Sequence, residues 1–355
     1  MDRARDGRCF RARALSLLRL HPLCSPEPCF SFSLDVPTAA TAYAPGRANL
    51  FGEHAECTAG FSLPVCLELG TAVVGAKRSV GPAEVQLFSA AAQQAAHWDG
   101  KATKIDAEDQ GTWRGLVKGC VLTFGEGYQE KEGRAFECPA FSAVITSNVP
   151  QRSGLASSAS LTVAFMTFLE ELSGCRFKPE KKAQLCLAAT RDVAGAQCGI
   201  IDHFAAAMGK HGNAILVDYR TLSSVCYPTG NGAVKVLVTK TGANPTLGAA
   251  GYAQRLTCCA EALQAVNASA QSAVKTLSNA ELSAVEALEG SISEGAIRCA
   301  RHVITENQRC QGAAAAFKSK VRCTPTVKNS RCETDSSQFS ASGLRCGRQT
   351  DAQQP

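Results

Sequence analysis

The chain has 355 residues, of which 45% are hydrophobic and 19% are charged, and its formal net charge is +6. A chain of this size and composition buries an ample core, and its length predicts two lobes. It contains no secretory apolar segment and no apolar run long enough to cross a membrane, so we expect neither secretion nor a membrane partner.

The two ends of the chain account for its net positive charge. Residues 1–20 hold six arginines against two aspartates, and residues 318–355 hold seven basic against three acidic side chains. The part between them is therefore slightly acidic, which argues against a nucleic-acid-binding face on the fold. Residues 1–35 are predicted to be a disordered extension, with a mitochondrial transit peptide as the alternative for its arginine-rich start. Residues 318–355 have almost no apolar periodicity and are predicted to be a disordered tail.

Residues 45–57 form the first candidate site. Arg47, Glu53, His54 and Glu56 fall within ten positions of one another, between glycines. Carboxylates accept hydrogen bonds from adjacent hydroxyls, imidazole adds a contact, and arginine neutralises developing negative charge. The segment indicates a site for a hydroxyl-rich ligand, and a solvated turn is the alternative.

The second candidate site follows a strand predicted over residues 141–146. Residues 149–160 are mostly small and lead into a helix predicted over residues 156–172. At such a junction the free amides and the positive end of the helix dipole favour a bound phosphate. The hydroxyls of Ser157 and Ser158 would add contacts to phosphate or magnesium. The loop lacks the lysine of a Walker A motif, and a serine-capped helix without a ligand is the alternative.

Asp202 is the third candidate. It follows two isoleucines in a largely apolar segment, residues 194–208. A carboxylate in such surroundings is costly unless it is paired or functional. Arg47 is the candidate partner that would balance its charge. The alternative is a helix cap, because aspartate is common at that position.

The remaining pattern alternates strands with helices. Further strands are predicted over residues 63–67, 72–75, 213–218 and 234–239, and further helices over residues 179–193, 249–266, 280–287 and 294–306. This pattern predicts an α+β fold in which mixed sheets and helices pack in layers. The junction between the lobes is expected within residues 200–230.

Taken together, the three candidate segments resemble the GHMP kinase family and, within it, the galactokinases. Residues 46–54 match the signature Gly-Arg-x-Asn-Leu-Ile-Gly-Glu-His, with Phe51 in place of isoleucine. Residues 154–159 match the phosphate loop Gly-Leu-x-Ser-Ser-Ala, and residues 198–202 match the segment that carries the catalytic aspartate. The similarity extends over residues 43–317, which is most of the chain.

The resemblance implies a two-lobed GHMP-kinase-like fold and the ATP-dependent phosphorylation of galactose at its anomeric hydroxyl. The N-terminal lobe would span residues 36–210 and the C-terminal lobe residues 211–317. The expected ligands are a small-molecule sugar and ATP, with Mg²⁺ as the metal. The expected protein is a cytoplasmic monomer without a nucleic-acid or membrane partner.

The resemblance also implies roles for single residues. Asp202 would accept the proton of the anomeric hydroxyl, and Arg47 would stabilise Asp202 and lower the barrier at the γ-phosphate. The residues that would bind the sugar are Glu53, His54, Glu56, Gly199 and Tyr252. The residues that would bind ATP are Trp113, which would stack on the adenine, and Gly154, Leu155, Ala156, Ser157 and Ser158, of which the two serines would also contact Mg²⁺.

Several positions depart from the family pattern. Glu56 replaces an aspartate, and Thr190 stands where the family has a magnesium-binding glutamate. A hydroxyl is a weaker ligand than a carboxylate for a hard cation. Arg152 lies where the family loop is richer in glycine, and it would either crowd a phosphate or add charge to its site.

The C-terminal half contains no second glycine-rich segment of the type Gly-Gly-Gly-Phe-Gly-Gly. The resemblance then implies an incomplete second lobe. This leaves an alternative function open, namely a galactokinase relative or truncated product that binds sugar or nucleotide without turnover. N-acetylgalactosamine as the substrate is a third possibility.

The chain has 18 cysteines, but no two of them have the Cys-x-x-Cys spacing of a zinc or redox motif. Several lie in apolar patterns, where cysteine behaves as a small hydrophobic residue. Without a secretion signal we expect them to be reduced thiols.

Overall fold

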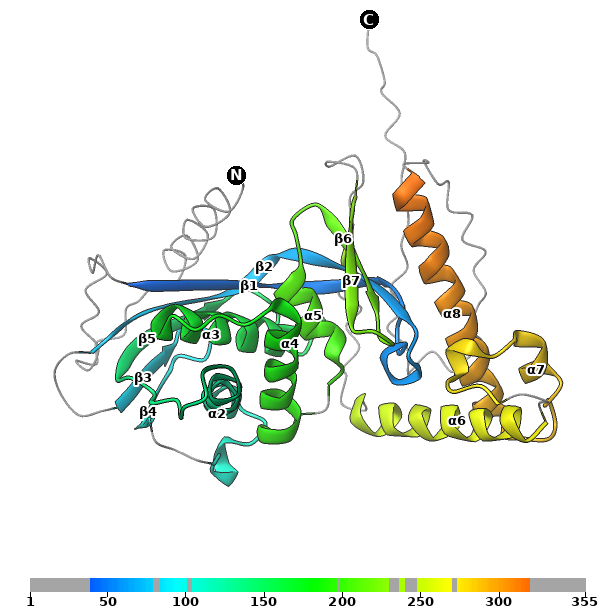
Figure 1. Ribbon diagram of the computed structural model, residues 1–355, viewed down its shortest axis with the longest axis horizontal. Coiled ribbons are helices and arrows are strands. Elements are labelled where there is room, and N and C mark those ends of the chain that lie inside the picture. Colours follow the sequence, from blue (N-terminus) through cyan, green and yellow to red (C-terminus); the bar gives the residue numbers. More distant parts are fainter. Residues whose placement is uncertain are drawn as a thin grey trace, which may run out of the picture. The chain divides into compact units, whose positions relative to one another are not determined.

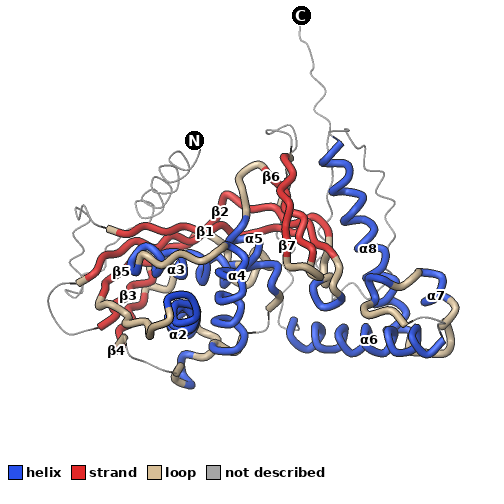
Figure 2. Tube along the Cα trace, viewed as in Figure 1, coloured by secondary structure: helices blue, strands red, loops and turns tan. Residues whose placement is uncertain are grey.

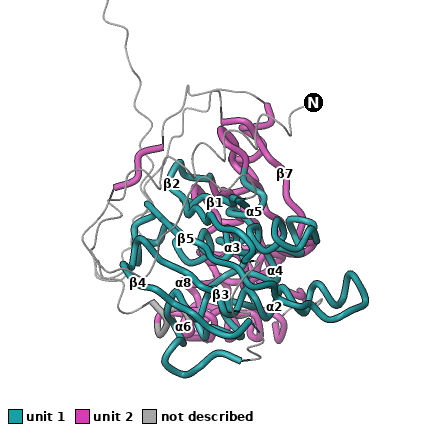
Figure 3. The backbone as a smooth tube through the Cα atoms, turned by 90° about the vertical axis from the view of Figure 1, so that its left-hand side faces the viewer, with its two compact units in different colours: residues 1–47, 66–209 teal, residues 48–65, 210–355 magenta. Residues whose placement is uncertain are grey.

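The computed structural model describes residues 39–78, 84–100, 104–196, 198–229, 236–239, 248–269 and 273–319. It divides into two compact units, which Figure 3 colours separately: unit 1 contains residues 1–47 and 66–209, and unit 2 contains residues 48–65 and 210–355. The predicted extension over residues 1–35 lies outside the described residues. So does the predicted tail, except for residues 318–319, which end a helix.

Unit 1 is built on a mixed sheet. Its strands follow the order β4–β3–β5–β2, and β1 pairs with β2. The pairs β3–β4 and β2–β5 are antiparallel, whereas β3 and β5 run parallel. The strands are β1 (Ala40–Phe51), β2 (Phe61–Lys77), β3 (Glu84–Ser89), β4 (Gln94–Asp99) and β5 (Phe141–Ser147).

Helices cover one face of this sheet, as Figures 1 and 2 show. Val85 and Leu87 of β3 alternate with less buried neighbours and join the same core as Phe124 and Phe168, since successive side chains of a strand point to opposite faces. The rings of Phe141 and Phe168 pack edge to face at 5.4 Å. The helices are α2 (Trp113–Glu132), α3 (Ser157–Ser173), α4 (Pro179–Ala188) and α5 (Ile200–Met208), and a π-helical turn (Ala189–Val193) follows α4.

Unit 2 combines a hairpin with three helices. Strands β6 (Asn213–Asp218) and β7 (Ser223–Pro228) are antiparallel, and β6 also pairs with the first residues of β2. Helices α6 (Gly248–Ser269), α7 (Leu282–Glu286) and α8 (Glu294–Ser319) enclose an apolar core. A second cluster, which contains Leu63, Ala214 and Cys310, joins α8 to the strands.

Several predicted elements differ from the structure. The strands predicted over residues 63–67 and 72–75 are parts of the single strand β2. The helix predicted over residues 179–193 is α-helical only to Ala188 and ends in the π-helical turn. The helix predicted over residues 294–306 extends to Ser319, because a run of alanines favours helix and Phe317 packs against the strands. Residues 236–239, the described part of the last predicted strand, are not a strand.

Across the described ranges, we find no helix with the length and apolar character needed to cross a membrane.

Candidate functional site

Arg47 of β1 joins two of the predicted site segments within unit 1. Its Nε donates a hydrogen bond to Oδ1 of Asp202 at 2.9 Å, and its Nη2 donates to the same oxygen at 2.5 Å. Its Nη1 donates to the carbonyl oxygen of Gly154 at 2.5 Å. The predicted contact between Arg47 and Asp202 is therefore confirmed, and the same guanidinium reaches the predicted phosphate loop.

The backbone of β1 brings Arg47 to this position. The amide of Arg47 donates to the carbonyl of Leu155 at 3.1 Å. A Cβ at Gly46 would lie only 2.7 Å from that carbonyl oxygen, so the strand approaches the loop this closely because residue 46 is glycine.

Asp202 lies in the first turn of α5, whose N-terminal flanking residue is Gly199. The side chains of Arg47 and Asp202 are 14% and 17% exposed, so the pair is mostly shielded from water but still reachable. The positive end of the helix dipole and the charge-assisted hydrogen bonds both favour a carboxylate here. The geometry presents an oriented acidic group beside an arginine that is also bonded to the loop before α3.

The predicted phosphate loop leads into α3 without a side-chain cap. Ala156 occupies the N-terminal flanking position with φ of 61°, and no side chain hydrogen bonds to the first turn. The alternative of a serine-capped helix is therefore wrong. The first amides of a helix have no intrahelical acceptor, so an uncapped N-terminus is suited to an anion. Ser157 and Ser158 lie in this first turn and are half-buried.

Ser160 fixes this helix start to the sheet, a role that the sequence reasoning missed. Its buried hydroxyl donates to the carbonyl of Ala44 at 2.8 Å and hydrogen bonds with Oγ1 of Thr71 at 2.8 Å. A serine within an otherwise apolar helix face is the signal that would have found it. Through Ser160 the strands β1 and β2 hold the helix that would orient a phosphate.

Trp113, the predicted adenine partner, is the first residue of α2. Its Nε1 donates to Oε1 of Gln94 at 3.2 Å, and its ring packs partly buried against the main core of unit 1. Its contact with adenine stays a prediction.

The predicted sugar residues Glu53, His54 and Glu56 lie on a loop of unit 2, between β1 and β2. Helix α8 holds this loop at three points. The amide of Gly52 donates to Oε1 of Glu306 at 2.6 Å, and the amide of Phe61 donates to Oδ1 of Asn307 at 3.0 Å. A third hydrogen bond, of 3.0 Å, joins Nε2 of His302 to the carbonyl oxygen of Glu53.

These anchoring residues of α8 were also missed from the sequence. Glu306 and Asn307 are each 8% exposed, on a helix face that is otherwise apolar. Polar groups buried this deeply need partners, and the backbone of the loop supplies them. In the sequence, the available signal was an acidic residue next to an amide residue on the apolar face of an amphipathic helix.

Burial, together with the nearby Arg255 and His302, lowers the pKa of His54 to about 4. Its imidazole is therefore neutral at pH 7, with one donor and one acceptor nitrogen. Of the other predicted sugar residues, Gly199 precedes α5 in unit 1. Tyr252 lies in α6, and its side chain is outside the described residues.

Gly52 begins this loop with φ of +93°, and a Cβ there would lie 2.3 Å from Cα of Ser62. Gly52→Ala is therefore expected to lower the free energy of unfolding by about 3 kcal/mol or more, from backbone strain and the clash together. Gly133→Ala is the matched control, because Gly133 has φ of +71° but open space around its missing Cβ. We expect it to cost about 1 kcal/mol. Urea unfolding measures both, and equal losses would contradict the role of the close contact.

Two family models match the chain: GHMP kinases N terminal domain over residues 115–210, and Galactokinase galactose-binding signature over residues 30–77. Galactokinase from Homo sapiens is 34% identical over 278 residues, which cover 78% of this chain and 67% of the human protein. Galactokinase from Pasteurella multocida is 30% identical over 298 residues, which cover 84% of this chain and 74% of the relative.

The chain belongs to the galactokinase family. The crystal structure of Lactococcus lactis galactokinase complexed with galactose superimposes with a TM-score of 0.67 at 26% identity, covering 80% of this chain and 71% of that one. The family resemblance and the α+β GHMP-kinase-like fold class predicted from the sequence are thereby confirmed.

Thr190 occupies the position where the resemblance implies a magnesium-binding glutamate. It is 1% exposed, its Oγ1 donates to the carbonyl of Cys186 at 2.8 Å, and it shares a hydrogen bond of 3.1 Å with Nε2 of His203. These partners hold the hydroxyl in the core of unit 1, so Thr190 is not a candidate metal ligand. The part of the chain that the structure describes contains no cluster of three His, Cys, Asp or Glu side chains suited to a metal.

His203, next to Asp202, gives the fold a dependence on pH. Burial lowers its pKa to about 4 from an ordinary 6.5. Between these values the unfolded chain binds more protons than the folded one. The contribution of neutral His203 to the free energy of unfolding is therefore fully present above pH 6.5 and is lost as the pH falls towards 4. The shift corresponds to roughly 3 kcal/mol at most. His203→Gln is expected to flatten this slope in urea unfolding measured from pH 7 to 4, and an unchanged slope would contradict it.

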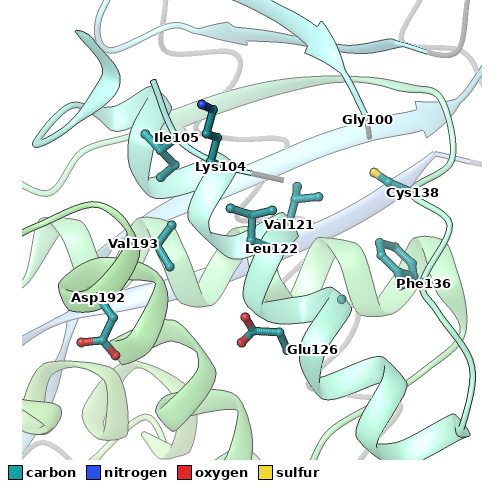
Figure 4. Close-up of a pocket in the computed structure, with 11 residues that line it drawn as sticks. Gly100, Lys104, Ile105, Val121, Leu122, Glu126, Phe136, Cys138, Asp192 and Val193 are labelled. Atoms are coloured by element: carbon teal, nitrogen blue, oxygen red, sulfur yellow. The ribbon is translucent and has the colours of Figure 1, made fainter. Parts of the chain in front are cut away.

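A cavity of about 590 Å³ lies elsewhere in unit 1, along α2. Figure 4 shows Val121, Leu122 and Glu126 of α2 facing Phe136 and the π-helical turn with Asp192. None of the predicted site residues lines this cavity. The candidate site is therefore defined by the cluster around Arg47 and not by this cavity.

Proposed function

We propose that the chain transfers the γ-phosphoryl group of ATP to the anomeric hydroxyl of galactose, giving galactose 1-phosphate and ADP. The observation that carries this proposal is the side chain of Arg47, which binds Asp202 and the carbonyl of Gly154 together. Membership of the galactokinase family supports it, as does the galactose bound to the Lactococcus lactis relative.

Asp202 accepts the proton of the anomeric hydroxyl as the new O–P bond forms and the bond between the γ-phosphorus and the bridging oxygen of ADP breaks. Proton transfer by a positioned carboxylate contributes about 10²–10⁴-fold to such a step. Arg47 orients Asp202 through two hydrogen bonds and places positive charge next to the loop that receives the phosphates. Phosphoryl transfer depends mainly on such alignment and charge neutralisation.

The phosphates of ATP bind to the loop 150–156 and to the uncapped N-terminus of α3, where the backbone amides of the first turn are the donors. The hydroxyls of Ser157 and Ser158 and the phosphate oxygens are the oxygen ligands that Mg²⁺ prefers, so the metal would enter with the nucleotide. Trp113 stacks on the adenine. Arg152 is exposed, which supports the reading that it adds charge to the phosphate site.

The sugar contacts are assigned to Glu53, His54, Glu56, Gly199 and Tyr252. The first three lie within the match to the galactose-binding signature, residues 30–77. Neutral His54 donates to one hydroxyl or accepts from another, while the carboxylates accept from adjacent hydroxyls. We further propose that the protein is monomeric and cytoplasmic.

Neither the described residues nor the relatives favour the alternative of a protein that binds sugar or nucleotide without turnover. A coupled assay with each sugar distinguishes galactose from N-acetylgalactosamine as the substrate.

The test is the rate of ADP release in a coupled assay with ATP and Mg²⁺, run with galactose, N-acetylgalactosamine, glucose or no sugar. The proposal predicts galactose-dependent turnover at least about tenfold faster than with the other sugars, because a site built for a hydroxyl rejects an analogue that lacks or displaces it. Binding of galactose in a thermal shift assay without any ADP release would support the alternative instead.

A further inference from the structure

A buried aspartate lies shortly before α2, the helix that begins with Trp113. Asp109 ends a short 3₁₀ turn, is 2% exposed, and belongs to none of the candidate sites described above. Its Oδ1 accepts a hydrogen bond from Nε of Arg114 at 2.7 Å, and its Oδ2 pairs with Nζ of Lys118 at 2.6 Å. Both partners lie in the first two turns of α2. The carboxylate therefore ties the turn to the start of the helix at two points.

The backbone of the same aspartate holds the cap of α2. The carbonyl oxygen of Asp109 accepts hydrogen bonds from the hydroxyl and the amide of Thr112, at 2.7 and 3.1 Å. The hydroxyl of Thr112 accepts in turn from the amide of Gly115 at 3.2 Å and caps the helix. A Cβ at Gly115 would lie 2.2 Å from the carbonyl oxygen of Asp109, so the turn packs this closely because residue 115 is glycine. Asp109 thus contacts the residues on both sides of Trp113.

Lys118 makes the charge of this carboxylate important. Its side chain is 11% exposed, and its Nζ lies 5.7 Å from the ring centre of Trp98. The other carboxylate that it reaches, that of Asp106 at 2.9 Å, is 60% exposed. Removing one partner of a buried ion pair leaves the other charge without compensation. Loss of the charge of Asp109 would therefore loosen the link between the turn and α2, even with a side chain of the same size.

We propose that Asp109 is a positioning residue for ATP, which fixes the first turn of α2 and thereby the orientation of the Trp113 indole against the adenine base. Nε1 of the indole is held separately, by the hydrogen bond of 3.2 Å to Oε1 of Gln94. Stacked rings attract each other only within a limited range of offsets and tilts, and a side chain that is already ordered loses less entropy on binding. The inference rests on the proposed contact between Trp113 and adenine.

The test compares Asp109→Asn with the unmodified protein in the coupled assay with ATP, Mg²⁺ and galactose, and by isothermal titration calorimetry with ADP. Asparagine keeps the size of the side chain and removes its charge. We expect KM for ATP and Kd for ADP to rise about tenfold, which is the size of effect found for one stacked base. KM for galactose and kcat are expected to change by less than about twofold, because only nucleotide binding is weakened.

Glu170→Gln is the matched control. Glu170 lies in the last turn of α3, is also 2% exposed, and pairs with Nζ of Lys182 at 2.7 Å. Its replacement removes a buried ion pair of the same kind, and urea unfolding measures the cost to stability in both variants. We expect Glu170→Gln to leave KM for ATP and Kd for ADP unchanged. If the two variants raised KM for ATP equally, Asp109 would only stabilise the fold, and the proposal would be overturned.

A milder change tests the same link from the other side. Arg114→Gln removes the more exposed of the two partners, whose side chain is 34% exposed, and is expected to raise Kd for ADP about threefold. An unchanged Kd in this variant would overturn the proposal even if Asp109→Asn did not fold.

Trp113→Leu shows whether Asp109 acts through the indole. This change is expected to raise Kd for ADP about tenfold, and the addition of Asp109→Asn to raise it by less than about twofold more, since both changes act on the same contact. A further rise of about tenfold would show that Asp109 acts independently of Trp113 and would overturn the proposal. An unchanged Kd in Trp113→Leu would remove the adenine contact and this inference with it, whereas galactose-dependent ADP release would still report on the kinase activity.

Discussion

Replacing Asp202 by asparagine is expected to lower kcat for galactose phosphorylation about 10³-fold, within the range found for the loss of a positioned proton acceptor. The amide has nearly the same shape and still accepts a hydrogen bond from Arg47 through its oxygen, so the fold and the position of the arginine are preserved. It takes up no proton from the sugar hydroxyl. We expect KM for galactose to change by no more than about threefold, because the sugar contacts are made by other residues.

Asp192→Asn is the matched control for this measurement. Asp192 is an exposed carboxylate on the π-helical turn of the same unit, and it lines the cavity of Figure 4. Its replacement is expected to leave kcat unchanged. If Asp202→Asn kept more than about a tenth of the activity, or if both variants lost it equally, Asp202 would not be the proton acceptor.

Replacing Arg47 by lysine is expected to lower kcat about 10²-fold, and replacing it by methionine about 10³-fold or more. Lysine keeps the positive charge, but a single ammonium group does not reproduce the fork that now reaches Oδ1 of Asp202 and the carbonyl of Gly154. Methionine keeps much of the length and removes the charge. Both variants are measured in the same assay, with circular dichroism to verify the fold.

The combination of Arg47→Met with Asp202→Asn separates a shared role from two independent ones. Residues that act as one unit lose less together than the product of their separate losses. We therefore expect the double variant to be no more than about tenfold slower than the slower single variant. Losses that multiply would show that the two side chains act separately, despite the hydrogen bonds between them.

The sequence was sufficient to predict the pairing of Arg47 and Asp202, for two reasons. An unpaired carboxylate among apolar residues is costly, and the signature that contains Arg47 offered a cation. The strand–loop–helix arrangement of the candidate phosphate loop was predicted from the sequence pattern, which is a local property. The strand and helix around it, β5 and α3, were predicted to within one residue at each end.

Other features depend on contacts that a single sequence does not display. Strand β1 was not predicted, because Pro45, Gly46 and Arg47 interrupt its apolar pattern with residues that are unfavourable inside a strand. A serine cap at the start of α3 was the alternative to a phosphate loop, but Ala156 adopts a left-handed conformation there, and the amides of the first turn are left without a side-chain acceptor. Helix α2 was also missing from the predicted elements, although Thr112 caps it and Gly133 ends it.

The longest-range contacts were the hardest to predict. Glu306 and Asn307 hold the signature loop from about 250 positions further along the chain, so only the folded structure brings them together. Thr190 was read as a weakened metal ligand from its place in the family pattern. In the structure its hydroxyl forms hydrogen bonds with the carbonyl of Cys186 and with His203, and these bonds explain why a threonine can be buried at this position.

Phosphorus NMR of the reaction mixture tests the proposed chemistry most directly, because it reports which oxygen of the sugar receives the phosphoryl group. With galactose, ATP and Mg²⁺, the proposed mechanism predicts that the signals of ADP and of a phosphate ester on the anomeric carbon grow together. Both should be nearly absent with Asp202→Asn. Inorganic phosphate in place of the ester, an ester on another hydroxyl, or an anomeric ester formed equally well by Asp202→Asn would contradict it.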